Sequence, residues 1–350
     1  MSGNDKRIEL DNLTQVFRGA AFRQTGGELV AVDHVSFSLN AQPPQIVSLV
    51  GESGSGKSTI ARIILGLQRP SGGSVTYRGK DVYHLSREEF RQYRREVQVV
   101  FQDPYGIFNP FYRVDRIFWT AIRKFGLARS QNEGLALIEQ SLDAVDLRPT
   151  DVLGRYPHQL SGGQRQRVML ARVHMLHPEF IIADEPVSML DAAVRVLFLN
   201  ILLDFKERFG MTTLFITHDL STAYYLGGQI MVISNGRIVE HGDMDDVMLR
   251  PAHPYTQQLL TSLPIPEPEA RWRERLSLAE HRADGEAFTR ERCLFAERCP
   301  DVMDRCWRER PELVTVRERQ DARCFLYGPG GSVKVDGAAT KAATKVDERA

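Results

Sequence analysis

A glycine-rich loop between two patterned segments constrains this sequence most. Residues 45–50 (QIVSLV) are apolar and β-prone, and a helical pattern runs from Lys57 to Leu67. The loop between them, Gly51-Glu52-Ser53-Gly54-Ser55-Gly56-Lys57-Ser58-Thr59, fits the pattern G-x-x-x-x-G-K-[ST]. Its glycines let backbone N–H groups turn inward around phosphate oxygens, and the helix N-terminus adds a favourable dipole. The sequence therefore predicts a strand–loop–helix unit that binds phosphate, which we favour over a plain Gly/Ser-rich turn.

Two further apolar runs also end in polar residues. Phe180–Ala183 is followed by Asp184-Glu185, and Thr212–Ile216 is followed by Thr217-His218-Asp219. Strands that are buried on both faces and separated by helical stretches are typical of a parallel sheet. We therefore predict an α/β fold with a mainly parallel sheet. The stretch from about residue 105 to 165 has helix-forming patterns only, and we interpret it as a helical insertion.

The polar residues around the loop have the chemistry of a nucleotide site. Lys57 would reach the β- and γ-phosphates, and the Ser58 hydroxyl would bind magnesium together with Asp184. Glu185 is placed to polarise an attacking water molecule. An Asp-Glu pair at a strand end is by itself more often a helix cap or a solvated turn. Its combination with the phosphate loop favours the functional interpretation.

A second glycine motif gives the sequence a family resemblance. Leu160-Ser161-Gly162-Gly163-Gln164 precedes Asp184-Glu185 by about twenty residues, and this combination resembles the signature of ABC-type ATPases. The resemblance covers roughly residues 8–250 and extends to further single residues. Alone, each of these would be an ordinary surface, capping or core residue. They are Gln102 (the Q-loop and a magnesium ligand), Asp191 (the D-loop, with Met189 where the family more often has Ala), His218 (the switch histidine) and Phe17 (the residue that stacks on adenine).

The resemblance implies a fold, cofactors and a mode of assembly. The fold is the P-loop NTPase ABC cassette, a RecA-like core with a helical subdomain, and the cofactors are ATP and Mg²⁺. In the family, two cassettes dimerise head to tail, so that the phosphate loop of one faces the Ser161–Gln164 segment of the other across the nucleotide. This chain has one such loop and one signature, so it supplies half of each of two sites.

All four cysteines lie near the C-terminal end, with the spacing Cys293-x5-Cys299-x6-Cys306-x17-Cys324. Such clustering points to a metal centre, and iron–sulfur clusters accept more varied spacings than zinc sites with tight C-x2-C pairs. Zinc and packing as small apolar side chains remain alternatives. Nearby, His253-Pro254-Tyr255-Thr256, Cys299-Pro300 and residues 310–313 resemble the C-terminal extension of oligopeptide/dipeptide-type ABC ATPases. That resemblance implies a 4Fe–4S cluster held by the four cysteines.

Composition limits the partners and the location. The chain of 350 residues has 45 basic and 45 acidic side chains, and a zero net charge argues against nucleic-acid binding. It has no run of about 18 apolar residues and no signal-peptide pattern, so we expect it to stay in the cytoplasm. The resemblance implies a peripheral protein on the cytoplasmic face of the bacterial inner membrane. Its implied partners are two transmembrane permeases, a paralogous ABC ATPase and an extracytoplasmic solute-binding protein.

We expect three parts along the chain. Residues 1–250 would form the ATPase domain, and residues 251–327 the C-terminal extension, with Pro264, Pro266 and Pro268 in a linker. Residues 328–350 are mostly small or charged and are expected to be disordered. The function that follows is ATP-driven import of peptides or related solutes. The alternative is a soluble ABC ATPase of the repair or translation type, although such proteins usually have two cassettes or basic surfaces.

Overall fold

A computed structural model describes residues 7–19, 28–103, 106, 108–262 and 290–327. The linker prolines and the expected disordered tail at 328–350 lie outside the described residues. None of the described helices is long and apolar enough to cross a membrane.

The centre of the molecule is a parallel sheet with the strand order β9-β3-β8-β7-β6. Its strands are almost entirely buried on both faces, which is why the sequence shows them as unbroken apolar runs. The polar residues predicted at the strand ends therefore meet at one edge of the sheet. The strands are β3 (Ile46–Val50), β6 (Val97–Val100), β7 (Phe180–Asp184), β8 (Thr212–Thr217) and β9 (Gln229–Ser234).

Antiparallel strands extend this sheet on the side of β9. β10 (Arg237–Asp243) pairs with β9, and β12 (Gln320–Ala322) and β11 (Val314–Arg317) follow in order. The sheet of eight strands is thus mixed, and the prediction of a mainly parallel sheet holds for its central five strands. The C-terminal strands β11 and β12 therefore belong to the same sheet as β3, the strand that precedes the phosphate loop.

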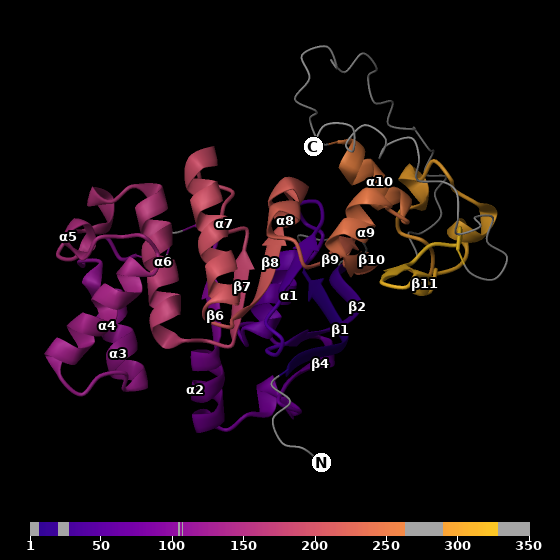
Figure 1. The fold of residues 1–350 in the computed structure, drawn as a ribbon. Helices are drawn as coiled ribbons and strands as arrows, with labels where there is room; N and C mark the ends of the chain where they lie inside the picture. Colours follow the sequence, from indigo (N-terminus) through magenta and orange to yellow (C-terminus); the bar gives the residue numbers. More distant parts are fainter. Residues whose placement is uncertain (1–6, 20–27, 104–105, 107, 263–289, 328–350) are drawn as a thin grey trace, which may run out of the picture.

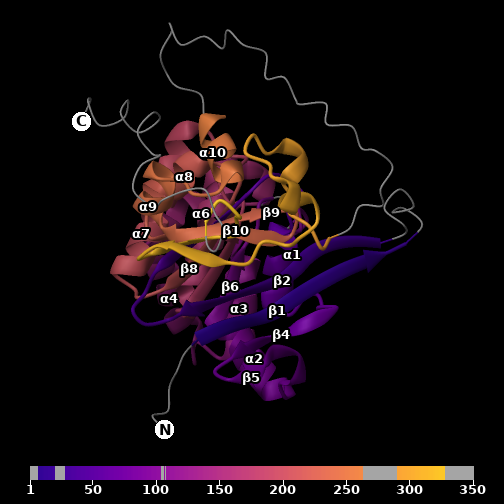
Figure 2. The ribbon, with the colours of Figure 1, turned by 90° about the vertical axis from the view of Figure 1, so that its right-hand side faces the viewer.

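A separate antiparallel sheet was not predicted from the sequence. It has the order β2-β1-β4-β5 and packs with α1 (Lys57–Ile64) in one apolar core (Figure 2). In β1, Ile8 and Leu10 are buried while Glu9 and Asp11 are exposed, as in a strand with one solvated face. The strands are β1 (Arg7–Arg18), β2 (Glu28–Asn40), β4 (Gly72–Tyr77) and β5 (Lys80–Asp81).

Helices cover the other face of the main sheet (Figure 1). α6 (Gly162–Leu176) and α7 (Ala192–Glu207) pack on each other, and α3 (Asp115–Phe125) and α4 (Gln131–Asp143) pack against α6. The described residues between 108 and 161 contain no strand. The remaining helices are α2 (Arg87–Glu96), α5 (Pro149–Val152), α8 (Leu220–Leu226), α9 (Met244–Leu249) and α10 (Pro254–Thr261).

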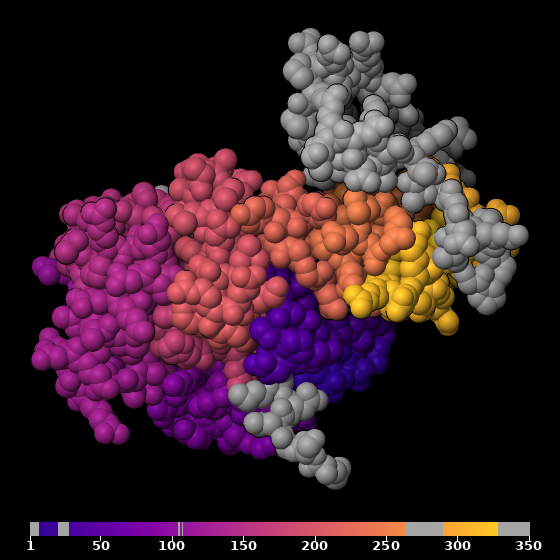
Figure 3. Space-filling view, in the orientation of Figure 1, coloured from indigo at the N-terminus to yellow at the C-terminus, as the bar shows by residue number. Residues whose placement is uncertain are grey.

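Residues 290–327 pack against the rest of the molecule (Figure 3). Phe295 joins the apolar cluster formed by β9, β10, α8 and α10. The buried carboxylate of Asp33 on β2 accepts hydrogen bonds from Arg237 (2.8 Å) and Arg290 (2.9 Å). This C-terminal segment is therefore anchored to the ATPase part by apolar packing and by buried charge.

Candidate nucleotide site

The loop between β3 and α1 has a backbone that requires glycine. Gly56, which directly precedes α1, has φ +103°, and a Cβ atom there would lie 2.2 Å from the carbonyl oxygen of Ala31 on β2. A larger residue would collide with β2, so the close approach of loop and sheet depends on Gly56. The loop thus turns tightly and brings its N–H groups and the first turn of α1 together, which is an arrangement that fits a polyphosphate.

Lys57 lies beneath this loop and is 4% exposed. Its Nζ donates hydrogen bonds to the carbonyl oxygens of Gly51 (2.7 Å) and Glu52 (2.8 Å). Burial lowers the pKa of Lys57, and the negative charges of Glu185, Asp184 and Glu52 oppose this shift. The loop therefore encloses an ammonium group that can bind phosphate oxygens.

Two oxygen donors meet beside α1. The Ser58 hydroxyl donates to Oδ1 of Asp184, at the end of β7, over 3.0 Å. Burial raises the pKa of Asp184, and the hydrogen bond from Ser58 opposes this shift. A hydroxyl and a carboxylate next to a phosphate site are oxygen ligands of the type that Mg²⁺ prefers, so these residues fit the ion.

Glu185 follows β7 in a strained backbone conformation, with φ +46°. Its N–H donates to the carbonyl oxygen of Ile216 on β8 over 2.9 Å, which holds it in this conformation. Its Oε2 lies 3.0 Å from Nδ1 of His218, which follows β8. The ends of two adjacent strands therefore pair a carboxylate with an imidazole, and such a pair can orient and polarise a water molecule.

The Ser161–Gln164 segment forms the start of α6. Ser161 is the N-cap, and its hydroxyl accepts the N–H of Gln164 over 3.1 Å while the Gln164 side chain accepts the N–H of Ser161 over 2.9 Å. Gly163 faces α7, where a Cβ atom would lie 2.5 Å from Cγ1 of Val194. Gly162 has open space around it, so the first turn of α6 presents its N–H groups without a side chain in front.

The sequence is similar to a family of known proteins. The profile of the ABC transporter family matches residues 32–188, and that of the oligopeptide/dipeptide transporter C-terminal region matches residues 239–306. YkfD of Bacillus subtilis is 39% identical over 297 residues, which cover 85% of this chain and 89% of YkfD. The oligopeptide transport ATP-binding protein AppF of the same organism is 35% identical over 325 residues, or 91% of this chain and 97% of AppF. This chain belongs to the ABC transporter family.

A solved structure of the same family shares the fold. The ATP-binding cassette MJ0796, in a dimeric post-hydrolysis state bound to ADP and Pi, is 28% identical with a TM-score of 0.58. The match covers 68% of this chain and 98% of that chain. The fold is thus the ABC cassette of P-loop NTPases, and the protein is an ATP-binding ATPase.

The other residues that the sequence analysis assigned to the nucleotide site, Gln102, Phe17 and Asp191, lie on three different elements. Gln102 is exposed just after β6, and Phe17 is half-buried on β1, paired with Leu29 of β2. Asp191 is the N-cap of α7, and its carboxylate accepts the N–H of Val194 over 3.0 Å. Ser161–Gln164 and Asp191 make these hydrogen bonds within their own helices. The signature at the start of α6 and the phosphate loop before α1 stand on different helices, which are well separated in Figure 1.

Two polar side chains of the ABC site, the buried Gln166 and the partly exposed Arg195, were missed by the sequence analysis. Gln166 on α6 is 1% exposed and donates to the carbonyl oxygens of Phe101 (3.2 Å) and Pro186 (2.9 Å). Gln166 therefore links, through hydrogen bonds, the backbone next to Gln102 with the backbone next to Glu185. Arg195 on α7 lies 3.3 Å from the carboxylate of Asp219, next to His218. Gln166 stands between Arg165 and Arg167 in the polar start of α6, so the local sequence gave no signal that its side chain is buried.

The prediction of an iron–sulfur cluster is wrong. In the part of the chain that the structure describes, no group of three or more His, Cys, Asp or Glu side chains is placed to hold a metal ion, which also removes the support for zinc. Cys306 is buried with Ala296 and Phe325 in a small apolar cluster. Burial raises the pKa of Cys299 to about 11 and that of Cys324 to about 12, and it also raises the pKa of Cys293. The raised pKa values of these three residues favour the thiol over the thiolate that metals bind. Cys306 packs as a small apolar side chain.

Proposed function

We propose that this ATPase powers the import of peptides or related small solutes through partner permeases. The observation that carries the proposal is the tandem of an ABC cassette and an oligopeptide/dipeptide-type C-terminal region in one chain. The name of AppF, an oligopeptide transport ATP-binding protein, supports the same substrate class. The comparisons give no support to the alternative of an ABC ATPase that is not coupled to transport.

The geometry supports a division of roles among the site residues. Residues 51–59 would hold the phosphates of ATP, with Lys57 as the cation, and Phe17 would stack on the adenine. Ser58, Asp184 and Gln102 would hold Mg²⁺, which would neutralise phosphate charge. Glu185 would act as the general base, and the 3.0 Å contact with His218 would fix its carboxylate.

The signature segment and Asp191 would act on a second cassette. The open first turn of α6, with Gly162 unobstructed, is suited to meet the γ-phosphate bound by a facing phosphate loop. ATP would then hold two cassettes together, and hydrolysis would release them. One phosphate loop and one signature in this chain call for a second cassette. We infer that it is a paralogous ATPase, as the resemblance to peptide importers implies.

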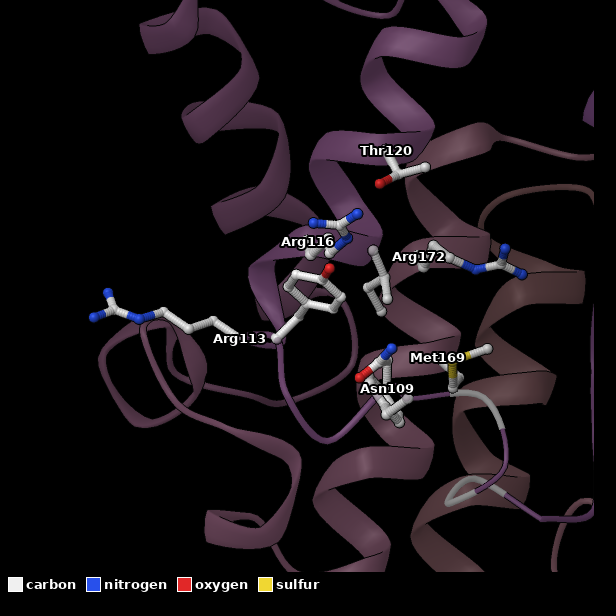
Figure 4. Close-up of a pocket in the computed structure, with 9 residues that line it drawn as sticks. Asn109, Arg113, Arg116, Thr120, Met169 and Arg172 are labelled. Atoms are coloured by element: carbon white, nitrogen blue, oxygen red, sulfur yellow. The ribbon is translucent and has the colours of Figure 1, made fainter.

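A groove between α3 and α6 is the place we propose for a permease helix. The hollow has a volume of about 350 Å³. Asn109, Arg116 and Arg172 are among the side chains that line it (Figure 4). Beside it Phe111 is 85% exposed, and the guanidinium of Arg116 lies 3.7 Å from the ring of Tyr112. An apolar rim with basic side chains suits a short amphipathic helix that carries an acidic residue.

The location and the division into parts follow from these roles. The protein would be peripheral on the cytoplasmic face of the bacterial inner membrane, bound through two transmembrane permeases and served by an extracytoplasmic solute-binding protein. Residues 1–250 would be the ATPase domain, with a helical subdomain at about 105–165, and residues 251–327 the C-terminal extension. The zero net charge supports the absence of a nucleic-acid partner.

Copurification from the native host tests this proposal. Tagged wild-type chain should retain two membrane-spanning subunits and a second ABC ATPase, and the ATPase rate of this complex should rise with peptide-loaded binding protein. Arg116→Glu should lose the membrane subunits, whereas Arg129→Glu, at an exposed position outside the groove, should retain them. Wild-type chain that brings down no membrane subunit would contradict the proposed function.

A further inference from the structure

The His253-Pro254-Tyr255-Thr256 motif has no role in the nucleotide site described above, yet it reaches the phosphate loop. Tyr255 lies in the first turn of α10 and is 1% exposed. Its hydroxyl oxygen accepts the backbone N–H of Glu52 over 3.0 Å. A side chain that follows the last strand of the ATPase part therefore binds the second residue of the phosphate loop, 203 positions earlier.

Buried hydrogen bonds hold Tyr255 in this place. The carboxylate of Glu240 on β10 is fully buried and accepts the N–H groups of Ala252 (2.7 Å) and His253 (2.9 Å). His253 in turn accepts the N–H of Tyr255 at its Nδ1 over 3.0 Å. The start of α10 is thus fixed to the main sheet, which sets the position of the Tyr255 hydroxyl.

Arg298 makes a second contact to the same loop residue from the C-terminal segment. Its guanidinium donates to both carboxylate oxygens of Glu52, over 2.9 and 3.1 Å. The Phe295 ring joins the two contacts, since it lies 5.5 Å from the Tyr255 ring and 5.7 Å from the Arg298 guanidinium. Glu52 is therefore held at its N–H by Tyr255, at its carboxylate by Arg298 and at its carbonyl oxygen by Lys57.

We propose that Tyr255 and Arg298 are positioning residues for ATP binding, which couple the C-terminal segment to the phosphate loop through Glu52. The inference rests on the proposed role of residues 51–59. A loop that is already held in its binding shape loses less conformational entropy when ATP binds. Coupling of this kind is reciprocal, so ATP must also strengthen the contacts of the C-terminal segment with the loop.

The affinity of the full chain for MgATP tests the Tyr255 contact. Tyr255→Phe removes the acceptor of the Glu52 N–H and should raise the Kd about two- to tenfold, the usual range for one hydrogen bond. The matched control is Tyr225→Phe, which removes a hydroxyl that donates to Asn200 (2.6 Å) and does not reach the loop. Its Kd should equal that of the wild type.

Arg298 gives a second variant that preserves the fold, because its side chain is 44% exposed. Arg298→Gln should raise the Kd less than Tyr255→Phe, by up to about fivefold, since exposed ion pairs contribute little. Arg298→Lys should restore part of the affinity, and Arg298→Gln should have no effect when Glu52 is already Gln. Arg305→Gln, which breaks the contact with Glu309 in the same segment, is the control.

Hydrogen exchange separates positioning from simple loss of structure. In the wild type, MgATP should slow exchange in α10 and residues 293–299, and Tyr255→Phe should reduce this ligand-induced difference. If Lys57→Ala still binds MgATP like the wild type, the proposed phosphate site fails. If Lys57→Ala loses binding while Tyr255→Phe and Arg298→Gln keep both the wild-type Kd and the ligand-induced protection, the positioning inference fails alone.

Discussion

The nucleotide site and the cysteine-bearing segment of residues 290–327 are stabilised in different ways. The site stands at the ends of β3, β7 and β8, whose side chains are almost all buried and whose backbones form continuous ladders. Residues 290–327 contain two short strands and single helical turns around small apolar clusters. They depend on anchors in the ATPase part, above all Asp33. We therefore expect single substitutions in the nucleotide site to stop ATP hydrolysis without unfolding the protein. Single substitutions that affect residues 290–327 should loosen this segment while the nucleotide site stays folded.

The largest expected effect is on the chemistry of the first region. Glu185→Gln keeps the shape of the site but removes the carboxylate, so turnover of the assembled complex should fall about 10²- to 10⁴-fold. Thermal unfolding and MgATP binding should stay near those of the wild type. The control is Glu207→Gln at an exposed position of α7. Near-normal turnover in Glu185→Gln would show that another group polarises the water.

Asp33 is the substitution with the largest expected effect on the C-terminal segment. Asp33→Asn leaves Arg237 and Arg290 without their shared carboxylate, and breaking a buried ion pair costs about 3–5 kcal/mol. Limited proteolysis should then cut residues 290–327 faster, while Asp11→Asn on the exposed face of β1 should have no such effect. Unchanged cleavage would mean that apolar packing alone anchors the segment.

The pH dependence of stability isolates the same carboxylate. Burial alone would raise the pKa of Asp33, but the hydrogen bond from His34 and the charges of Arg237 and Arg290 lower it from 3.8 to about 2. The ionised group therefore stabilises the folded state by about 2–3 kcal/mol above pH 4, and this contribution is lost as the pH falls from about 4 to 2. Denaturant titrations should show this loss in the wild type and not in Asp33→Asn. Equal acid sensitivity of both proteins would assign the loss to other groups.

The smallest effects should come from the cysteines. Cys306→Ser places a hydroxyl in an apolar cluster and should destabilise residues 290–327 by about 1–3 kcal/mol. Cys299→Ser, at a half-exposed position, should cost less. The rate of amide hydrogen exchange in residues 290–327 measures the destabilisation caused by each substitution. A larger loss for Cys299 than for Cys306 would contradict packing as the role of these side chains.

The phosphate loop was predictable because its structure and its ligand depend on residues that are consecutive in the sequence. Strand, glycines and Lys57 follow one another, so local backbone geometry fixes their arrangement. The strand-end residues Asp184, Glu185 and His218 were also predictable, because parallel strands bring their carboxyl ends together. The cysteines are different, since their spacing does not determine where the intervening chain places them.

Contacts between distant parts of the chain were beyond sequence reasoning. The antiparallel sheet of β1, β2 and β4 has one-faced alternation, which is a weaker pattern than the buried runs of the parallel strands. The pairing of β12 with β10 and the hydrogen bond from Glu52 to Tyr255 join residues that are 78 or more positions apart. Nothing in either local sequence specifies its partner.

A calorimetric titration of the full chain with MgATP tests the central claim most directly. The account predicts one MgATP per wild-type chain and a Kd about 10- to 100-fold higher for Lys57→Ala, because the charged hydrogen bonds to the phosphates are lost. Lys80→Ala, which breaks an exposed ion pair with Glu89, should bind like the wild type. Equal affinity of Lys57→Ala and wild type would contradict the assignment of the phosphate site to residues 51–59.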